Sequence, residues 1–305
     1  MNATRLAVVC AGGLAIVGAW MLWHPGGSAR GIAAYAPTTA TAPTIAQKEA
    51  DSAAPPGANI ATRSSEAQAA KAAYEASRDC YFAKSQIDAA MSVINACQAM
   101  PQVALTESQR ATCSRNIEQS RATIHELSAA AGTCPKGMAS ARSFYEATKA
   151  AAAQGDADAQ ACYVQSFFQS NGAHLTYHEQ DIDDYRRAAP QYIANGLSHG
   201  DWRMVALLAR GGHDESTGLL PLITRDDLYT QYVMNRLLQL GADGAYARQL
   251  SASIEASYLM PRTTQGPALT QEQIARGNKD ALDLFHRSFD HQGLLKGPPS
   301  ICIRD

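Results

Sequence analysis

Residues 80–134 read CYFAKSQIDAAMSVINACQAMPQVALTESQRATCSRNIEQSRATIHELSAAAGTC and contain four cysteines. Small and apolar residues recur there in alternating steps of three and four, which places them on one face of a helix. The first such face contains Ala73, Ala76, Cys80, Ala83, Ile87, Ala90, Ile94 and Cys97. The second contains Cys113, Ile117, Ser120, Ile124, Leu127, Ala131 and Cys134. We therefore expect an antiparallel helical hairpin with all four cysteines in the seam between its helices.

The cysteine spacing predicts two disulfide bonds within this hairpin. The favoured pairs are Cys97–Cys113 and Cys80–Cys134. Positions 80 and 97 are 17 residues apart and positions 113 and 134 are 21 apart, a difference of about 6 Å in helical rise. The second pair therefore requires the second helix to end near Gly132, so that Cys134 can fold back. Buried free thiols, which pack as small hydrophobic side chains, are the alternative.

The other cysteines extend this pattern. Of the seven, Cys10 lies in the apolar N-terminal segment, which leaves an even number in the rest of the chain. We expect Cys162 to pair with Cys302, which would lay the C-terminal tail against the folded body. A bond between Cys134 and Cys162 is the alternative, and it would exclude the hairpin pairing. Six cysteines that can form three bonds are typical of a protein in an oxidising compartment.

Residues 1–24 predict a membrane anchor. Residues 6–23, LAVVCAGGLAIVGAWMLW, are an uncharged apolar run long enough to span a bilayer. Arg5 precedes the run, and Trp20 and Trp23 lie at its far end, where indoles favour the membrane interface. We expect a single pass through the inner membrane, with everything after residue 24 in the periplasm. The alternative is a signal peptide whose cleavage leaves a secreted or periplasmic protein.

The rest of the chain is expected to be an all-α body on a flexible linker. Residues 25–64 are rich in Ala, Thr, Pro, Gly and Ser and predict a disordered linker. The hairpin should then occupy residues 65–135, and further helix pairs with a short extended tail should occupy residues 136–305. Three capping boxes, beginning at Ser65, Thr106 and Thr270, predict helix starts. The other helices are expected at about 139–153, 157–169, 181–198, 226–240, up to 259, and up to 289, with Pro190 kinking or beginning its helix.

Residues 151–160, AAAQGDADAQ, predict a tight corner between two helices. The alanines allow the helices to approach, Gly155 suits a left-handed turn, and Asp156 can cap the next helix. This stretch resembles the helix-turn-helix core of Sel1-like repeats, relatives of tetratricopeptide repeats, and the resemblance is clear only around residues 147–169. It implies stacked antiparallel helix pairs and an adaptor or scaffold role. Further corners are expected at Gly200–Asp201 and at Gly241–Asp243.

Composition and motifs exclude some classes of function. Formal net charge is −2, with both signs mixed along the chain and no basic stripe, which argues against a nucleic-acid partner. The sequence contains no GxSxG, HExxH, Walker, Rossmann or CxxC motif. We therefore assign no catalytic residue and no cofactor, and we expect a protein that is not an enzyme.

The nearest approach to a metal site is the segment that contains His174, His178 and Asp181. On a helix the two histidines would share a face, with the aspartate one turn further, which could hold a divalent metal. The competing interpretation is a polar connection between helices, whose aspartates cap the next helix and complement its dipole.

Together these features predict a membrane-tethered periplasmic adaptor that binds a protein or peptide. One alternative is an envelope enzyme, such as a cell-wall hydrolase that uses an isolated carboxylate, for which Glu179 or Glu255 would qualify. The other is a metal-binding envelope protein that uses the histidine segment.

The predicted topology can be tested with reporter fusions. A reporter that is active only in the periplasm, fused after Ile60, should give signal, because Arg5 is expected to hold the N-terminus in the cytoplasm. A cytoplasm-only reporter at the same position should be silent. The opposite pattern of signals would reverse the topology.

Overall fold

The computed structural model describes residues 58–101, 105–170, 173–210, 218–224, 227–262 and 266–303. All of them belong to one structural unit, Pro55–Asp305. The predicted membrane anchor and almost all of the predicted linker lie outside the described residues. Within these ranges, no helix combines the length and the apolar character that a bilayer span requires.

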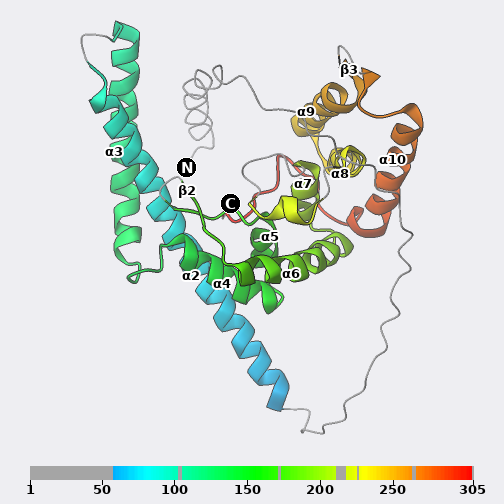
Figure 1. The fold of residues 1–305 in the computed structure, drawn as a ribbon, viewed down its shortest axis with the longest axis horizontal. Helices are drawn as coiled ribbons and strands as arrows, with labels where there is room; N and C mark the ends of the chain where they lie inside the picture. The colour runs from blue at the N-terminus through cyan, green and yellow to red at the C-terminus, as the bar shows by residue number, and fades with distance from the viewer. Residues whose placement is uncertain are drawn as a thin grey trace. The chain divides into compact units, whose positions relative to one another are not determined.

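Helices build this unit, which confirms the expected all-α class for the described residues (Figure 1). The α-helices are α2 (Ala58–Ala99), α3 (Glu107–Gly132), α4 (Ala141–Ala153), α5 (Ala157–Gln165), α6 (Glu179–Ser198), α7 (Trp202–Arg210), α8 (Leu228–Gly241), α9 (Gly244–Ile254) and α10 (Gln271–Leu284). A 3-10 turn, η3 (Leu220–Leu222), precedes α8, and two π turns, η4 (Glu255–Leu259) and η5 (Phe285–Phe289), extend α9 and α10.

Two very short strand pairs interrupt the helices, and the sequence did not predict them. The antiparallel pairs are β1 (Gln169–Ser170) with β2 (Ala173–His174), and β3 (Pro261–Arg262) with β4 (Gly266–Pro267). Gln169 lies opposite His174, and Pro261 lies opposite Pro267. Each pair closes a short connection between helices and adds no sheet layer to the fold.

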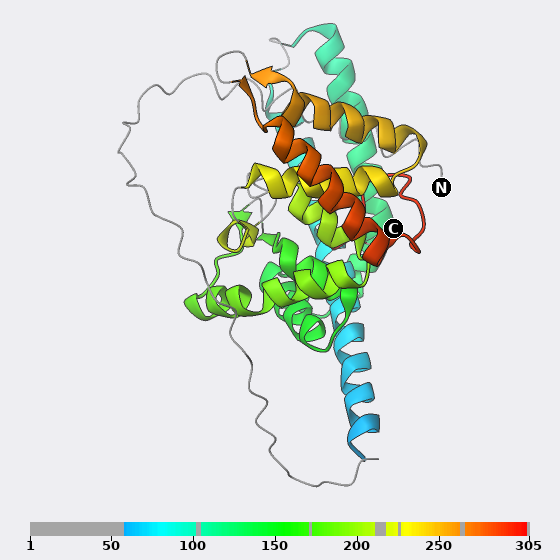
Figure 2. The same ribbon diagram turned by 90° about the vertical axis from the view of Figure 1, so that its right-hand side faces the viewer.

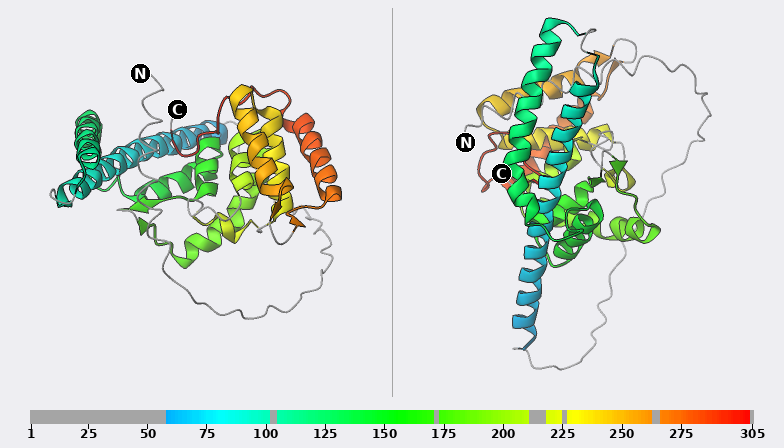
Figure 3. Two further views of the ribbon diagram at one scale, coloured as in Figure 1. Left: turned by 90° about the horizontal axis from the view of Figure 1, so that it is seen from above. Right: turned by 90° about the vertical axis from the view of Figure 1, so that its left-hand side faces the viewer.

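The helices α2 and α3 lie side by side as an antiparallel hairpin (Figure 3). Two disulfides cross the seam, Cys97–Cys113 with a Cα separation of 5.5 Å and Cys80–Cys134 with 5.7 Å. Helix α3 ends at Gly132, so Cys134 lies beyond the helix and reaches Cys80. These are the two pairs that the spacing favoured, and the helix ends where the outer pair requires it to end.

The start of α2 differs from the prediction. The helix begins at Ala58, so Ser65 lies inside it and does not cap it. Residues 58–64, ANIATRS, contain neither proline nor glycine, so they offer no break, whereas Pro55, Pro56 and Gly57 do. A capping-box pattern therefore acts as a helix start only where the preceding residues cannot continue the helix, as at Thr106 and Thr270, where both boxes form.

The buried face of α2 also departs from the predicted seam. Ala73 and Ala76 are exposed, whereas Tyr74, Tyr81 and Arg78 are buried. In this part α2 packs against α4, and the rings of Tyr74 and Tyr81 stack within 6.0 and 4.9 Å of the Phe144 ring. The seam pattern describes only the half of α2 that faces α3.

Three helix pairs follow the hairpin along the chain, α4 with α5, α6 with α7, and α8 with α9. Helix α5 also contacts α6, and α7 contacts α8, so each pair packs on the next. Helix α10 returns to pack on α8 (Figure 2). Pro190 lies inside α6, which begins at Glu179 and continues to Ser198. The alternative that α6 begins at Pro190 is therefore wrong.

Two of the predicted glycine corners form in the same way. Gly155 and Gly200 have φ angles of +90° and +73°, in the left-handed region. The backbone N–H of the following aspartate then donates to the helix that has just ended, from Asp156 to Ala151 O at 3.1 Å and from Asp201 to Gly196 O at 2.9 Å. This is the Schellman arrangement that ends a helix with its carbonyls satisfied.

The third predicted corner is wrong in its mechanism. Gly241 has no positive φ angle, and the left-handed glycine at this corner is Gly244. A Cβ atom on Gly241 would lie 2.1 Å from the ring of Trp202, so this glycine is required for close packing of α8 on α7. The Trp202 ring in turn lies 4.4 Å from the Phe289 ring, which makes it a packing residue.

Helix α5 ends four residues earlier than predicted. Ser166 adopts a left-handed conformation with φ of +55° directly after the helix. Tyrosine hydroxyls satisfy carbonyls at this end: Tyr185 donates to Val164 O at 2.6 Å and Tyr177 donates to Ser166 O at 2.8 Å. Because both tyrosines come from residues further along the chain, the local pattern could not place the end.

Helix α7 lies between two apolar clusters. Met204 and Leu207 pack into a cluster built mainly by α2, α4, α5 and α6, and Val205 and Ala209 pack into one built by α8, α9 and α10. All four side chains are at most 8% exposed. A nine-residue helix thus connects the first half of the described fold to the second.

The C-terminal tail crosses the end of the third helix pair and returns to the first. Leu295 donates from its N–H to Gly241 O at 2.8 Å and accepts from the N–H of Asp243 at 2.9 Å. Further on, Ile301 is buried, and Cys302 forms a disulfide with Cys162 of α5. The third bond is therefore the pair that laid the tail against the body, not Cys134–Cys162.

The two glycine corners provide a matched test of packing against backbone conformation. Gly155→Ala should destabilise the protein by about 1 kcal/mol, because only the left-handed φ is unfavourable and nothing lies within 4 Å of the added Cβ. Gly200→Ala should cost about 2 to 5 kcal/mol, because its Cβ would also lie 2.3 Å from Ser288 O. Denaturant unfolding of the two variants measures this difference, and equal losses would contradict it.

Candidate functional site

The predicted metal-binding segment surrounds the start of α6. His178 is exposed and immediately precedes the helix, and Asp181 lies in its first turn and is buried. One carboxylate oxygen of Asp181 accepts both from Arg142 Nη1 at 2.7 Å and from the backbone N–H of His178 at 2.9 Å. Asp181 thus caps α6 and ties it to α4, as the competing interpretation expected.

These contacts decide the charge of Asp181. Burial alone would raise the pKa of its carboxyl group, but the hydrogen bonds from Arg142 and His178 outweigh burial and lower the pKa overall. The carboxylate is therefore ionised at neutral pH and already paired. Among the described side chains, no group of three metal-binding residues is close enough to hold an ion. The side chain of His174 lies outside the described part, so the metal site stays a prediction.

The two carboxylates proposed for an isolated hydrolytic site lie on separate elements. Glu179 is the exposed first residue of α6, and Glu255 is the exposed first residue of the π turn η4. Glu255 lines a cavity, and the described residues that line it include no second carboxylate. Glycoside hydrolysis normally uses a carboxyl pair, so the structure offers no partner for Glu255 within this cavity.

One cavity of about 400 Å³ lies where α6, α7, η3 and α8 meet. Its lining residues are Pro190, Ile193, Leu208, Ile223, Thr224, Asp227, Thr230 and Gln231. Asp227 is occupied as the cap of α8: it accepts from the N–H of Tyr229 at 3.0 Å and from the Thr230 hydroxyl at 2.6 Å. The remaining surface of this cavity, hereafter the α6–α8 groove, is mainly apolar with hydroxyl and amide groups.

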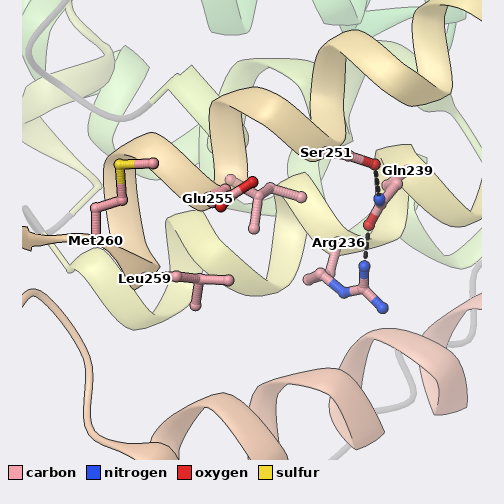
Figure 4. A pocket seen from close by; sticks show the side chains of 7 residues that line it. Arg236, Gln239, Ser251, Glu255, Leu259 and Met260 are labelled. Atoms are coloured by element: carbon pink, nitrogen blue, oxygen red, sulfur yellow. Dashed lines mark hydrogen bonds between the residues drawn. The ribbon is translucent and has the colours of Figure 1, made fainter.

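A second cavity of about 400 Å³ lies between α8 and the end of α9 (Figure 4). Its lining residues are Arg236, Gln239, Ser251, Ile254, Glu255, Leu259 and Met260. Arg236 Nη1 donates to Gln239 Oε1, and the Gln239 amide donates to the Ser251 hydroxyl. We call this cavity the α8–α9 pocket.

Sequence reasoning missed both cavities. It selected Glu255 only as a carboxylate and gave no binding role to Arg236 or Pro190. The one signal that could have pointed to the α8–α9 pocket is Leu259–Met260, two large apolar residues directly before a proline. Every other part of both linings depends on which helices pack together.

Comparison with known proteins adds no family assignment. No protein-family model matches the chain, and no curated protein and no solved structure is significantly similar to it. What the protein does must therefore be inferred from its own residues.

The role of Asp181 predicts a pH-dependent loss of stability. At about pH 7, Asp181→Asn should destabilise the protein by about 1.5 to 3 kcal/mol, because Arg142 and the His178 N–H lose a charged acceptor. Because the pKa of Asp181 is lower in the folded state than in the unfolded state, ionised Asp181 stabilises the fold. This stabilisation is complete above the unfolded-state pKa of 3.8 and is lost as the pH falls through the folded-state pKa. The difference between variant and wild type should therefore shrink in acid below pH 3.8.

Urea unfolding over this pH range measures the effect. Asp183 lies on the same helix but is exposed, and its Oδ1 is 3.8 Å from Nη1 of the exposed Arg186. The matched control Asp183→Asn should therefore change stability little at any pH. A loss at Asp181 that is independent of pH would contradict the assigned charge pair.

Proposed function

We propose that this protein is a membrane-tethered periplasmic adaptor whose helix pairs bind a segment of a protein or peptide partner. The serial packing of α4–α5, α6–α7 and α8–α9 supports a repeat-like scaffold, and so does the Sel1-like stretch around Gly155. Proteins built from such stacked units use the surface between neighbouring units for binding. Three disulfides in the described region support an oxidising location, and the apolar residues 6–23 support a tether.

The observation that carries this proposal is the position of the α6–α8 groove. It lies between α6 and α8, which are the first helices of two consecutive pairs. Leu208 of α7 also lines it. Pro190 and Ile193 of α6 supply apolar surface, and Thr230 of α8 lines the same groove. A partner side chain that is apolar would replace water on this surface, which is the main favourable contribution to association.

Hydroxyl groups suit the groove to a partner's backbone. Thr224 donates to Leu220 O at 2.9 Å and Thr230 donates to Asp227, so both protons are used within the protein. Each hydroxyl oxygen still has lone pairs that can accept from an N–H group. The groove therefore fits a peptide segment that places one apolar side chain inside and presents backbone N–H groups to the two threonines.

Crosslinking from the groove tests the proposal. A photo-crosslinking residue in place of Thr230 should capture a discrete partner in intact envelopes, whereas the same residue in place of the exposed Gln249 on α9 should not. Pro190→Arg should reduce the Thr230 crosslink at least about tenfold. The bound partner's apolar side chain would cover the charge of the new arginine, and burying an unpaired charge is unfavourable. Pro190 is exposed on a helix, so its replacement should leave the fold intact.

Pro190→Ala is the matched control, because it removes the proline without adding charge or bulk. It should retain the crosslink. Equal crosslinking from all variants, or peptidoglycan digestion that Glu255→Gln abolishes, would contradict the adaptor proposal.

A further inference from the structure

The α8–α9 pocket contains a cation, Arg236, whose hydrogen-bonding capacity is only partly used. Arg236 donates from Nη1 to Gln239, but its Nε–H is buried and has no acceptor in the described part of the chain. The ion pairs of the described residues include none with Arg236, although Glu255 lines the same pocket. Because Nε has almost no accessible surface, a ligand in the pocket would meet the guanidinium through Nη2, for which the described residues supply no acceptor.

The neighbours of Arg236 hold its guanidinium in place. Gln239 accepts from Nη1, donates to Ser251, and Ser251 donates to Ala247 O at 3.0 Å. This chain of hydrogen bonds runs from α8 to α9 and uses one amide proton of Gln239 and the hydroxyl proton of Ser251. The Nη2 group of Arg236 remains, and a guanidinium N–H forms a strong, charge-assisted hydrogen bond with a carboxylate.

The other end of the pocket is apolar and open. Leu259 is 39% exposed and Met260 is 51% exposed, and the buried Ile254 lines the same pocket. Figure 4 shows Arg236, Gln239 and Ser251 at one end of the pocket and Leu259 and Met260 toward the other. A ligand that fits both ends has a carboxylate within a few atoms of an apolar group.

Glu255 restricts the ligand further. Its carboxylate lines the pocket between these ends and can only accept hydrogen bonds when ionised. The alkyl chain of a fatty acid offers Glu255 no hydrogen-bond donor. A peptide offers a backbone N–H close to its terminal carboxylate, so it suits all three parts of the pocket.

We propose that the α8–α9 pocket binds the C-terminal carboxylate of a peptide that ends in an apolar residue. The carboxylate pairs with Arg236, the terminal side chain packs on Leu259 and Met260, and a backbone N–H donates to Glu255. This site is separate from the α6–α8 groove and would give the adaptor a second contact that reads the end of a chain.

Binding of short peptides to the full-length, oxidised protein tests the proposal. The probe is an acetylated hexapeptide that ends in alanine–leucine with a free carboxylate, and the comparison is the same peptide with an amidated C-terminus. Calorimetry should show a dissociation constant below about 1 mM for the free acid and at least about tenfold weaker binding for the amide. Octanoate, which lacks the donor for Glu255, should also bind at least about tenfold more weakly than the peptide.

Variants of the pocket provide the second half of the test. Arg236→Gln should weaken binding of the free acid at least about tenfold, and Arg236→Lys should weaken it too, because a lysine lacks the planar guanidinium that Gln239 holds in place. Arg248→Gln removes one positive charge from an exposed position on α9 and should leave binding unchanged. Circular dichroism and thermal unfolding of each variant establish that it folds before binding is compared.

Four results would overturn the proposal: no binding of the free acid, equal binding of the amidated peptide, equal binding of octanoate, or a folded Arg236→Gln variant that binds as wild type does. If Arg236→Gln does not fold, Arg236→Lys and the amidated peptide decide the outcome. Pro190→Arg should leave peptide binding unchanged, so failure of this site and failure of the α6–α8 groove are distinguishable.

Discussion

The described fold depends on α7, a nine-residue helix that is buried on opposite faces. Met204 and Leu207 face the hairpin and the first helix pairs, and Val205 and Ala209 face the later helices. A surface helix usually has one apolar face. A helix with two apolar faces, such as α7, is stable only where other elements pack on both of them. The α6–α8 groove lies beside α7, where Leu208 is only partly buried and lines the groove together with residues of α6 and α8.

Much of the described fold could be predicted because its decisive contacts follow local spacing. The cysteines belong to patterns of small and apolar residues in steps of three and four, and these patterns predicted the hairpin and its two disulfides. A helical face can be predicted in this way because it depends on sequence spacing alone. Gly155 and Gly200 were found for the same reason: a left-handed residue followed by a capping aspartate is a local signal. The box at Ser65 misled because capping competes with helix continuation, which depends on the residues before it.

Almost nothing of the two cavities could be predicted, because each lining combines residues from helices that meet only after folding. Asp181 illustrates this limit on a smaller scale: the sequence offered it as a metal ligand, but its partner Arg142 lies 39 residues earlier. The same holds for Gly241, whose requirement comes from the ring of Trp202 and not from its own backbone. Residue types indicated that these positions mattered, and only tertiary packing showed how.

The Cys162–Cys302 bond joins positions 140 residues apart, so α6 to α10 and both cavities form a covalently closed ring. Cys80–Cys134 closes a second ring that contains most of the hairpin. If the protein were held at its N-terminus and pulled from its C-terminus, the force would cross each bond and pass along residues 134–162 between them. The two rings would carry no tension, so the binding surfaces would keep their shape under a load that stretches the rest of the chain.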